Sequence, residues 1–150
     1  MSEVKFSEMT VEKSFEFDAA HRLLNYEGAC KNLHGHRWKV GVEVSKPSNY
    51  ITDNGFLFDF HDFKFFGEWL KEKFDHATII NKKDIHLCAF AIANKQKQYV
   101  MEGNPTVENL SLVMLSRLRN SIFSVCRIKL TIWETPSSKL TLTSEAPTNV

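Results

Sequence analysis

The feature that most restricts the fold is a strict alternation of apolar and polar residues over residues 37–44. The apolar members are Trp38, Val40, Val42 and Val44, and the residues between them are Arg37, Lys39, Gly41 and Glu43. A period of two is typical of an antiparallel strand with one buried face. The same parity continues back to His36 and His34, so the pattern predicts that both imidazoles lie on the inward face.

An earlier segment carries the same signature. Its inward positions share odd numbers: Val11, Phe15, Phe17, Ala19 and His21. We predict a strand that ends at His21 with this side chain facing inward. A hairpin-like pairing of the two strands would bring His21 beside His34 and His36.

Helical patterns follow a turn-rich region that contains Pro47, Ser48, Asn49, Asp53, Asn54 and Gly55. Asp59 can cap a helix whose apolar residues recur at steps of three and four: Phe60, Phe63, Phe66, Leu70 and Phe74. A short helix is predicted from Asp84 to about Asn94. Another follows the cap at residues 104–106, with an apolar stripe of Leu110, Val113, Met114 and Leu118.

The chain closes with a second alternating segment, and a hairpin partner is predicted over about Lys139 to Thr143. The alternating face consists of Cys126, Ile128, Leu130, Ile132 and Glu134. The order is therefore two strands, helices and two strands. This order predicts an α+β domain, with helices on one face of an antiparallel sheet.

Length and composition favour a single soluble domain over residues 1–150, with 43% hydrophobic and 25% charged residues. The net charge is +1 and no Lys/Arg run is dense, so we expect no nucleic-acid partner. The longest apolar run is far short of the roughly 20 residues that span a bilayer, so no membrane partner is expected. The N-terminus lacks the apolar stretch of a signal peptide, and a cytoplasmic location is the default.

Three inward-facing histidines indicate a metal centre. A single histidine at a strand end is usually a hydrogen-bonded structural residue, but burying three unpaired imidazoles together is costly. Three nitrogen ligands with an open fourth position are typical of catalytic zinc, which predicts Zn²⁺ on His21, His34 and His36. His61 and His86 lie in predicted helices without partners in sequence, and we interpret both as structural.

The three cysteines differ in their surroundings, and their odd number argues against a disulfide scaffold. Cys88 has apolar neighbours in sequence and Cys126 shares a strand face with Ile128 and Leu130, so both are predicted to lie in the core. Cys30 stands in a polar loop just before the histidine strand, where zinc and Lys31 would favour its thiolate. We expect a reactive thiol beside the metal. The alternative is that Cys30 closes a structural Cys-His₃ site.

Two acidic positions complete the set of candidate residues. Asp75-His76 follows the aromatic helix, and such a pair is more often a helix-end cap than a catalytic unit. Glu134 is more informative, because it falls on the apolar face of the last long strand, where an unpaired carboxylate is costly. It should meet a ligand with donor groups or a basic side chain.

Several short motifs then match a known family in order. They are residues 17–23 (FDAAHRL), Cys30-x-x-x-His34-Gly35-His36, Asp59-Phe60, Asp75-His76, residues 104–109 (NPTVEN) and Trp133-Glu134-Thr135. Together they resemble the 6-pyruvoyl-tetrahydropterin synthase family, particularly its 6-carboxy-5,6,7,8-tetrahydropterin synthase branch. The three-residue gap between Cys30 and His34 resembles that branch. The chain departs from the commonest bacterial pattern between Asn81 and Gly103, where it carries extra residues.

The resemblance implies the T-fold, a four-stranded antiparallel sheet with helices on one side. It also implies a homo-oligomer, a trimer or hexamer, with active sites at subunit interfaces. It assigns zinc to the three histidines, the base to Cys30, and a proton relay to Asp75 and His76. Glu134 and Thr106 would bind the pterin.

The implied reaction converts 7,8-dihydroneopterin triphosphate to 6-carboxy-5,6,7,8-tetrahydropterin, with release of acetaldehyde and triphosphate. It is a lyase step toward 7-deazaguanine bases such as queuosine. Two other interpretations stay open. One is 6-pyruvoyl-tetrahydropterin synthase, which eliminates triphosphate but keeps the side chain, and the other is a non-enzymatic zinc protein.

Overall fold

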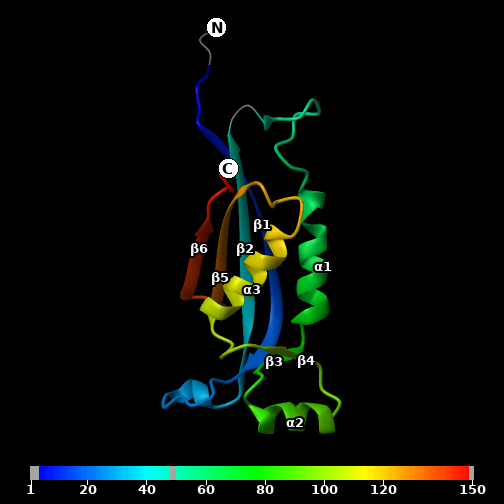
Figure 1. The fold of residues 1–150 in the computed structure, drawn as a ribbon, viewed down its shortest axis with the longest axis vertical. Coiled ribbons are helices and arrows are strands. Elements are labelled where there is room, and N and C mark those ends of the chain that lie inside the picture. The colour runs from blue at the N-terminus through cyan, green and yellow to red at the C-terminus, as the bar shows by residue number, and fades with distance from the viewer. Residues whose placement is uncertain (1–3, 48–49, 149–150) are drawn as a thin grey trace.

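The computed structural model describes residues 4–47 and 50–148, so Ser48 and Asn49 of the predicted turn lie outside the described residues. The strands are β1 (Glu8–His21), β2 (His34–Pro47), β3 (Ala77–Asn81), β4 (Gln98–Met101), β5 (Arg127–Thr135) and β6 (Ser138–Ser144). The helices are α1 (Lys64–Lys73), α2 (Ile85–Ala93) and α3 (Val107–Arg119) (Figure 1). Short 3₁₀ helices of the described residues cover Ala29–Lys31 and Phe60–Phe63.

The six strands form one sheet in the order β4-β3-β1-β2-β5-β6. The pairs β1–β2, β2–β5 and β5–β6 are antiparallel, and these four strands are the ones that the alternation predicts. The expected four-stranded sheet is extended by β3 and β4, which pair in parallel. Alternation does not reveal them, because β3 is buried on both faces and β4 has only four residues.

The pairing of β1 with β2 fixes the inward face of the sheet. Trp38, Val40, Val42 and Val44 are all 0% exposed, as their alternation predicts. The register places Phe17 opposite Trp38 and His21 opposite His34. The two strands therefore hold their histidines at one end of a continuous apolar face.

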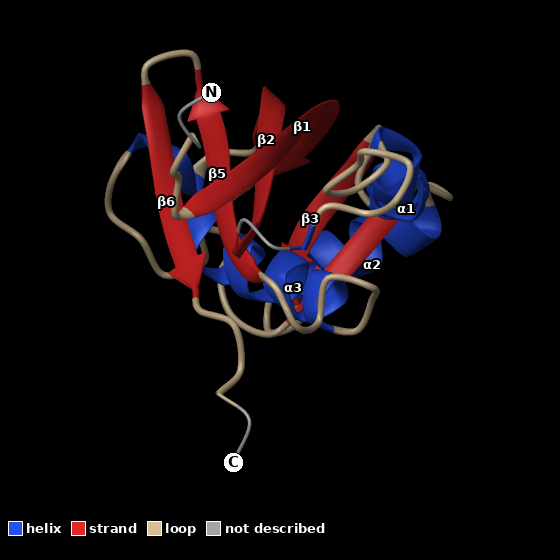
Figure 2. Ribbon diagram, turned by 90° about the horizontal axis from the view of Figure 1, so that it is seen from above, coloured by secondary structure: helices blue, strands red, loops and turns tan. Residues whose placement is uncertain are grey.

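Helices α1 and α3 pack on this inward face, and the sheet curls around them (Figure 2). Of the residues predicted for the first helix, Phe63, Phe66, Leu70 and Phe74 are buried. The prediction is wrong for Phe60, which is 58% exposed. Residues 60–63 form a 3₁₀ helix with three residues per turn, and its phase differs from that of the following α-helix. In α3, Leu110, Met114 and Leu118 are each 0% exposed.

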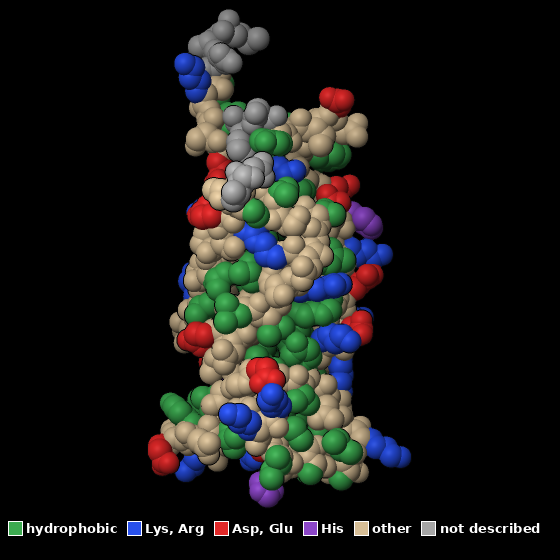
Figure 3. All heavy atoms as spheres, in the orientation of Figure 1, with side chains coloured by type: hydrophobic (Ala, Val, Ile, Leu, Met, Phe, Trp, Pro, Cys, Tyr) green, Lys and Arg blue, Asp and Glu red, His purple; other side chains and the backbone are tan. Residues whose placement is uncertain are grey.

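Helix α2 lies on the other side of the sheet, against β3. Its Leu87 and Ala91 pack on Ile80, whereas the neighbouring Ile79 belongs to the main core. Adjacent residues of a strand point to opposite faces, so the expectation of helices on one face holds for α1 and α3 but not for α2. Apolar side chains remain exposed over α2 at the foot of the molecule (Figure 3). None of the helices in the described ranges is long and apolar enough to cross a membrane.

An ion pair attaches α2 to the end of β1. The Arg22 guanidinium donates two hydrogen bonds of 2.7 Å to the Asp84 carboxylate, which is 2% exposed. The same carboxylate caps α2 by accepting from the Leu87 N–H at 3.1 Å. These hydrogen bonds, above all those from Arg22, lower the pKa of Asp84.

We predict that Asp84→Ala lowers the free energy of unfolding by about 2–4 kcal/mol, because it removes charged hydrogen bonds and a helix cap. The contribution of the pair is complete above the unfolded-state pKa of about 3.9 and is lost as pH falls further. Urea unfolding at pH 7 and at low pH measures both effects. Glu68→Ala is the control, since its pair with Lys64 is exposed at both ends and should contribute less than about 1 kcal/mol.

Candidate active site

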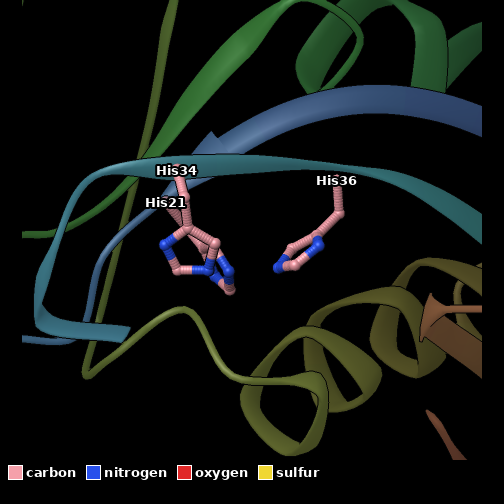
Figure 4. Close-up of side chains that lie close together, drawn as sticks. All are labelled: His21, His34 and His36. Atoms are coloured by element: carbon pink, nitrogen blue, oxygen red, sulfur yellow. The ribbon is translucent and has the colours of Figure 1, made fainter. Parts of the chain in front are cut away.

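Three histidine rings converge at one end of the sheet, on the side that faces the turn before α3 (Figure 4). One potential ligand atom from each of His21, His34 and His36 lies within 4.8 Å of the other two. His21 is 1% exposed, whereas His34 and His36 are partly exposed. The alternation in β1 and β2 thus predicts this grouping correctly.

Two of the rings are oriented by backbone carbonyls. His21 Nδ1 lies 2.8 Å from the Pro105 carbonyl oxygen, and His34 Nδ1 lies 2.7 Å from that of Asn32. A carbonyl only accepts, so each Nδ1 carries the hydrogen and each Nε2 keeps its lone pair. His21 Nε2 is buried and has no hydrogen-bond partner. A metal ion would satisfy this nitrogen, and a second-shell carbonyl is the usual support for a metal-bound histidine.

The electrostatics of the cluster favour neutral imidazoles. Burial is the largest cause that lowers the pKa of His21 and of His36, and neighbouring histidines lower both further. The Glu134 carboxylate opposes this effect at both rings. Metal binding requires the neutral ring, so these directions favour a ligand-ready state near neutral pH.

Glu134 faces the histidine cluster. Its Oε1 lies 3.4 Å from His21 Nε2 and 3.9 Å from His36 Nε2. The pairing of β5 with β6 is irregular between Trp133 and Thr135, which places Glu134 at a local bulge. Bulges often redirect side chains beside active sites. The carboxylate therefore lies within 4 Å of two imidazole nitrogens without a hydrogen bond to His21 Nε2.

A cavity of about 580 Å³ opens beside the cluster. His36 and Glu134 line it together with Arg37, Lys39 and Trp133. Sites for small molecules typically measure roughly 300–1,000 Å³ and combine apolar walls with a few polar groups. The cavity is thus large enough for a compact organic ligand in contact with the cluster.

The cysteines divide broadly as predicted. Cys126 is 1% exposed, and burial raises the pKa of its thiol. Cys88 is partly buried and packs against the small α2 core. Cys30 lies in the 3₁₀ helix Ala29–Lys31 and is partly exposed. The cluster of potential metal ligands found in the described part of the chain does not include it.

Asp75 and His76 form a separate pair, with His76 Nδ1 at 3.0 Å from Asp75 Oδ2. The Asp18 N–H donates to Asp75 Oδ1 at 3.0 Å, and this bond is the largest cause that lowers the pKa of Asp75. Over residues 4–47 and 50–148, no hydrogen bond or ion pair joins this pair to Cys30 or to the three histidines. His76 and His36 do line a common hollow of about 490 Å³.

The segment before α3 orients His21 and holds the loop after β1, in addition to capping the helix. Thr106 caps the helix by accepting from the Asn109 N–H at 3.3 Å. Asn104 joins the segment to the loop after β1, accepting from the Leu24 N–H at 2.9 Å and donating to the Leu24 carbonyl at 3.0 Å. This places the Pro105 carbonyl against His21. The sequence marks residues 104–106 as a helix cap and Thr106 as a pterin contact. It does not reveal that Asn104 bonds to Leu24 or that the Pro105 carbonyl meets His21.

A curled sheet with a partly buried three-histidine cluster beside a cavity defines an α+β protein with a candidate metal centre. The family model described as 6-pyruvoyl tetrahydropterin synthase matches residues 10–145, and the chain belongs to this family. It is 35% identical over 114 residues to the 6-carboxy-5,6,7,8-tetrahydropterin synthase of Rickettsia conorii, a match that covers 74% of this chain and 78% of the relative.

Two solved structures have the same fold. An uncharacterized protein from Wolinella succinogenes aligns with a TM-score of 0.78 and 22% identity, over 92% of this chain and 99% of the other. The 6-pyruvoyl tetrahydropterin synthase of Plasmodium falciparum aligns with a TM-score of 0.71 and 17% identity, over 93% of this chain and 99% of the other. The predicted T-fold is confirmed, with six strands in place of four.

We predict that the purified protein binds zinc at the cluster and that His34→Ala reduces this zinc to near zero, because it removes one of three candidate nitrogen ligands. Metal analysis by mass spectrometry measures this loss. His61→Ala is the matched control, since His61 is exposed and lies outside the cluster. Stoichiometric zinc in His34→Ala would remove His34 from the ligand set.

Proposed function

We propose that this protein is a zinc-dependent lyase that converts 7,8-dihydroneopterin triphosphate to 6-carboxy-5,6,7,8-tetrahydropterin, releasing acetaldehyde and triphosphate. This step leads toward 7-deazaguanine bases such as queuosine. The observation that carries the proposal is the buried, unpartnered Nε2 of His21 within a three-histidine cluster. The carboxy-tetrahydropterin name of the Rickettsia conorii relative supports this choice of reaction.

The three histidines would hold the zinc ion. When bound, zinc would act as a Lewis acid toward the side-chain oxygens of the substrate, making the adjacent C–H bond more acidic. Cys30, which is not part of the ligand cluster in the described residues, would accept the proton as a thiolate. His76, supported by Asp75, would return a proton elsewhere in the rearrangement.

Glu134 and Thr106 would hold the pterin ring. A carboxylate suits the 2-amino group and the neighbouring ring N–H, which can donate two parallel hydrogen bonds. The position of Glu134 in the wall of the cavity supports this role. In the described structure the hydroxyl of Thr106 caps α3, so a pterin contact would be additional to the cap.

We further propose that the active site is completed by a second copy of the chain in a trimer or hexamer. Within one chain, no hydrogen bond or ion pair of the described residues joins Asp75 or His76 to Cys30. The side chain of His76 is 78% exposed. An exposed relay on one copy could face the histidine cluster of its neighbour. Light scattering together with the activity of mixed variants tests this arrangement.

Two alternatives compete with this function. One is 6-pyruvoyl-tetrahydropterin synthase, after which the family model is named, and product analysis separates the two reactions. Incubation with dihydroneopterin triphosphate should release acetaldehyde for the carboxy reaction and none for the pyruvoyl reaction. A structural Cys-His₃ zinc protein would yield neither product, and its metal-bound thiolate would resist alkylation.

We predict that Cys30→Ala keeps full zinc and near-normal pterin binding, while turnover falls roughly 10²–10⁴-fold, as expected for the loss of a general base. Cys88→Ala is the matched control and should keep its turnover. Metal analysis, a melting curve and product formation are measured on each variant. Loss of zinc in Cys30→Ala would instead identify the thiol as a fourth ligand.

We predict that Glu134→Gln weakens substrate binding by about 1.5–3 kcal/mol, the range for hydrogen bonds to charged groups. Zinc content should not change, even though the carboxylate lies close to two of the ligands. Calorimetric titration and metal analysis measure the two quantities. Glu43→Gln, which alters a carboxylate paired with Lys129 elsewhere on the sheet, is the control. Unaltered affinity would show that Glu134 has only a structural role.

A further inference from the structure

The segment between Asn81 and Gly103 contains a lysine that reaches the candidate proton relay. Lys97 lies just before β4, and its carbonyl oxygen accepts from the Thr78 N–H of β3 at 3.0 Å. Its ammonium group donates to the Asp75 carbonyl oxygen at 2.6 Å and to the Lys71 carbonyl oxygen at 3.0 Å. The backbone of this segment is thus fixed to β3, while its side chain crosses to the end of α1.

The two carbonyls have different roles. The Lys71 carbonyl is among the last in α1, which have no partner within the helix and favour a cation. The Asp75 carbonyl belongs to the peptide that joins Asp75 to His76. The ammonium group therefore restrains the orientation of the peptide on which the relay is built.

His76 needs such a restraint, because its backbone is in the left-handed region with a φ of 58°. Such a conformation is uncommon for residues other than glycine and persists where the surroundings hold it. The His76 N–H donates to the Asp18 carbonyl at 2.6 Å, and the Asp18 N–H donates to the Asp75 carboxylate at 3.0 Å. Lys97 adds a side-chain hydrogen bond to the same turn, at the Asp75 carbonyl.

These contacts favour one orientation and one hydrogen-bonding pattern of the exposed His76 ring. The Asp75 carboxylate accepts a hydrogen from His76 Nδ1, which leaves Nε2 as the available nitrogen. With the side chain 78% exposed, packing contributes little to the orientation of the ring. The Asp75 carboxylate and the turn that carries it therefore orient the ring.

We infer that Lys97 is a positioning residue for the Asp75-His76 relay, and that the added segment contributes to turnover through this lysine. The inference rests on the proposed function. Lys97 acts through the Asp75 carbonyl and not on the substrate. Its loss should affect proton transfer and leave pterin and zinc binding unchanged.

The test compares Lys97→Met, Lys97→Arg and the control Lys83→Met in the full-length protein. Lys83 is an exposed lysine of the same segment, and its side chain makes no hydrogen bond or ion pair in the described structure. We expect Lys97→Met to lower kcat roughly 10- to 100-fold, the range for a small misplacement of a catalytic group. KM and zinc content should not change. Lys97→Arg should restore most of kcat, and Lys83→Met should match the wild type.

A second measurement does not depend on turnover. The ¹⁵N shifts of the His76 ring report which nitrogen carries the hydrogen, and Lys97→Met should change the single Nδ1–H form to a mixture. An unchanged kcat, an equal loss in Lys83→Met, or an unchanged His76 tautomer would each overturn the inference. If the wild type forms no product, the proposed function fails, and the ring shifts still decide whether Lys97 positions His76.

Discussion

The antiparallel pairing of β1 with β2 is the constraint on which the candidate site depends. Fourteen residues pair on each strand, and the register places His21 opposite His34 and Ala19 opposite His36. Because side chains alternate between faces, a slip of one residue would turn one strand's inward set toward solvent. The burial of Trp38 and Phe17 opposes such a slip, since it would expose large apolar surfaces. The apolar core therefore fixes the positions of the three imidazoles.

The sequence predicts those parts of the structure that follow one repeating pattern of apolar and polar residues. The alternation over β1, β2 and β5 predicted the inward histidines and the position of Glu134, because a strand has only two faces. It did not predict β3, whose Ile79 and Ile80 are buried on opposite faces, so that no polar residue marks an exposed side. The helical period wrongly placed Phe60 in the core. The error arises because the helix begins with a 3₁₀ turn, which changes its phase.

Contacts between distant segments lay outside the reach of the sequence pattern. The Pro105 carbonyl meets His21 across 84 residues, and Asn104 bonds to Leu24 across 80 residues. A backbone carbonyl is common to every residue, so no residue type marks this contact. The same holds for the Asp75 carbonyl, which meets Lys97. Sequence patterns thus identified the chemical groups of the site, and the fold supplied the contacts that orient them.

The unequal exposure of the three histidines divides the site into an enclosed side and a side open to solvent. His21 is enclosed, while His34 and His36 are open to solvent on one side. A metal ion would thus be held by one enclosed ligand and by two that solvent can reach. Since backbone carbonyls already orient His21 and His34, little chain entropy is lost when the ion arrives. Water and protons would therefore compete for the two outer rings, whereas burial protects the His21 nitrogen from both.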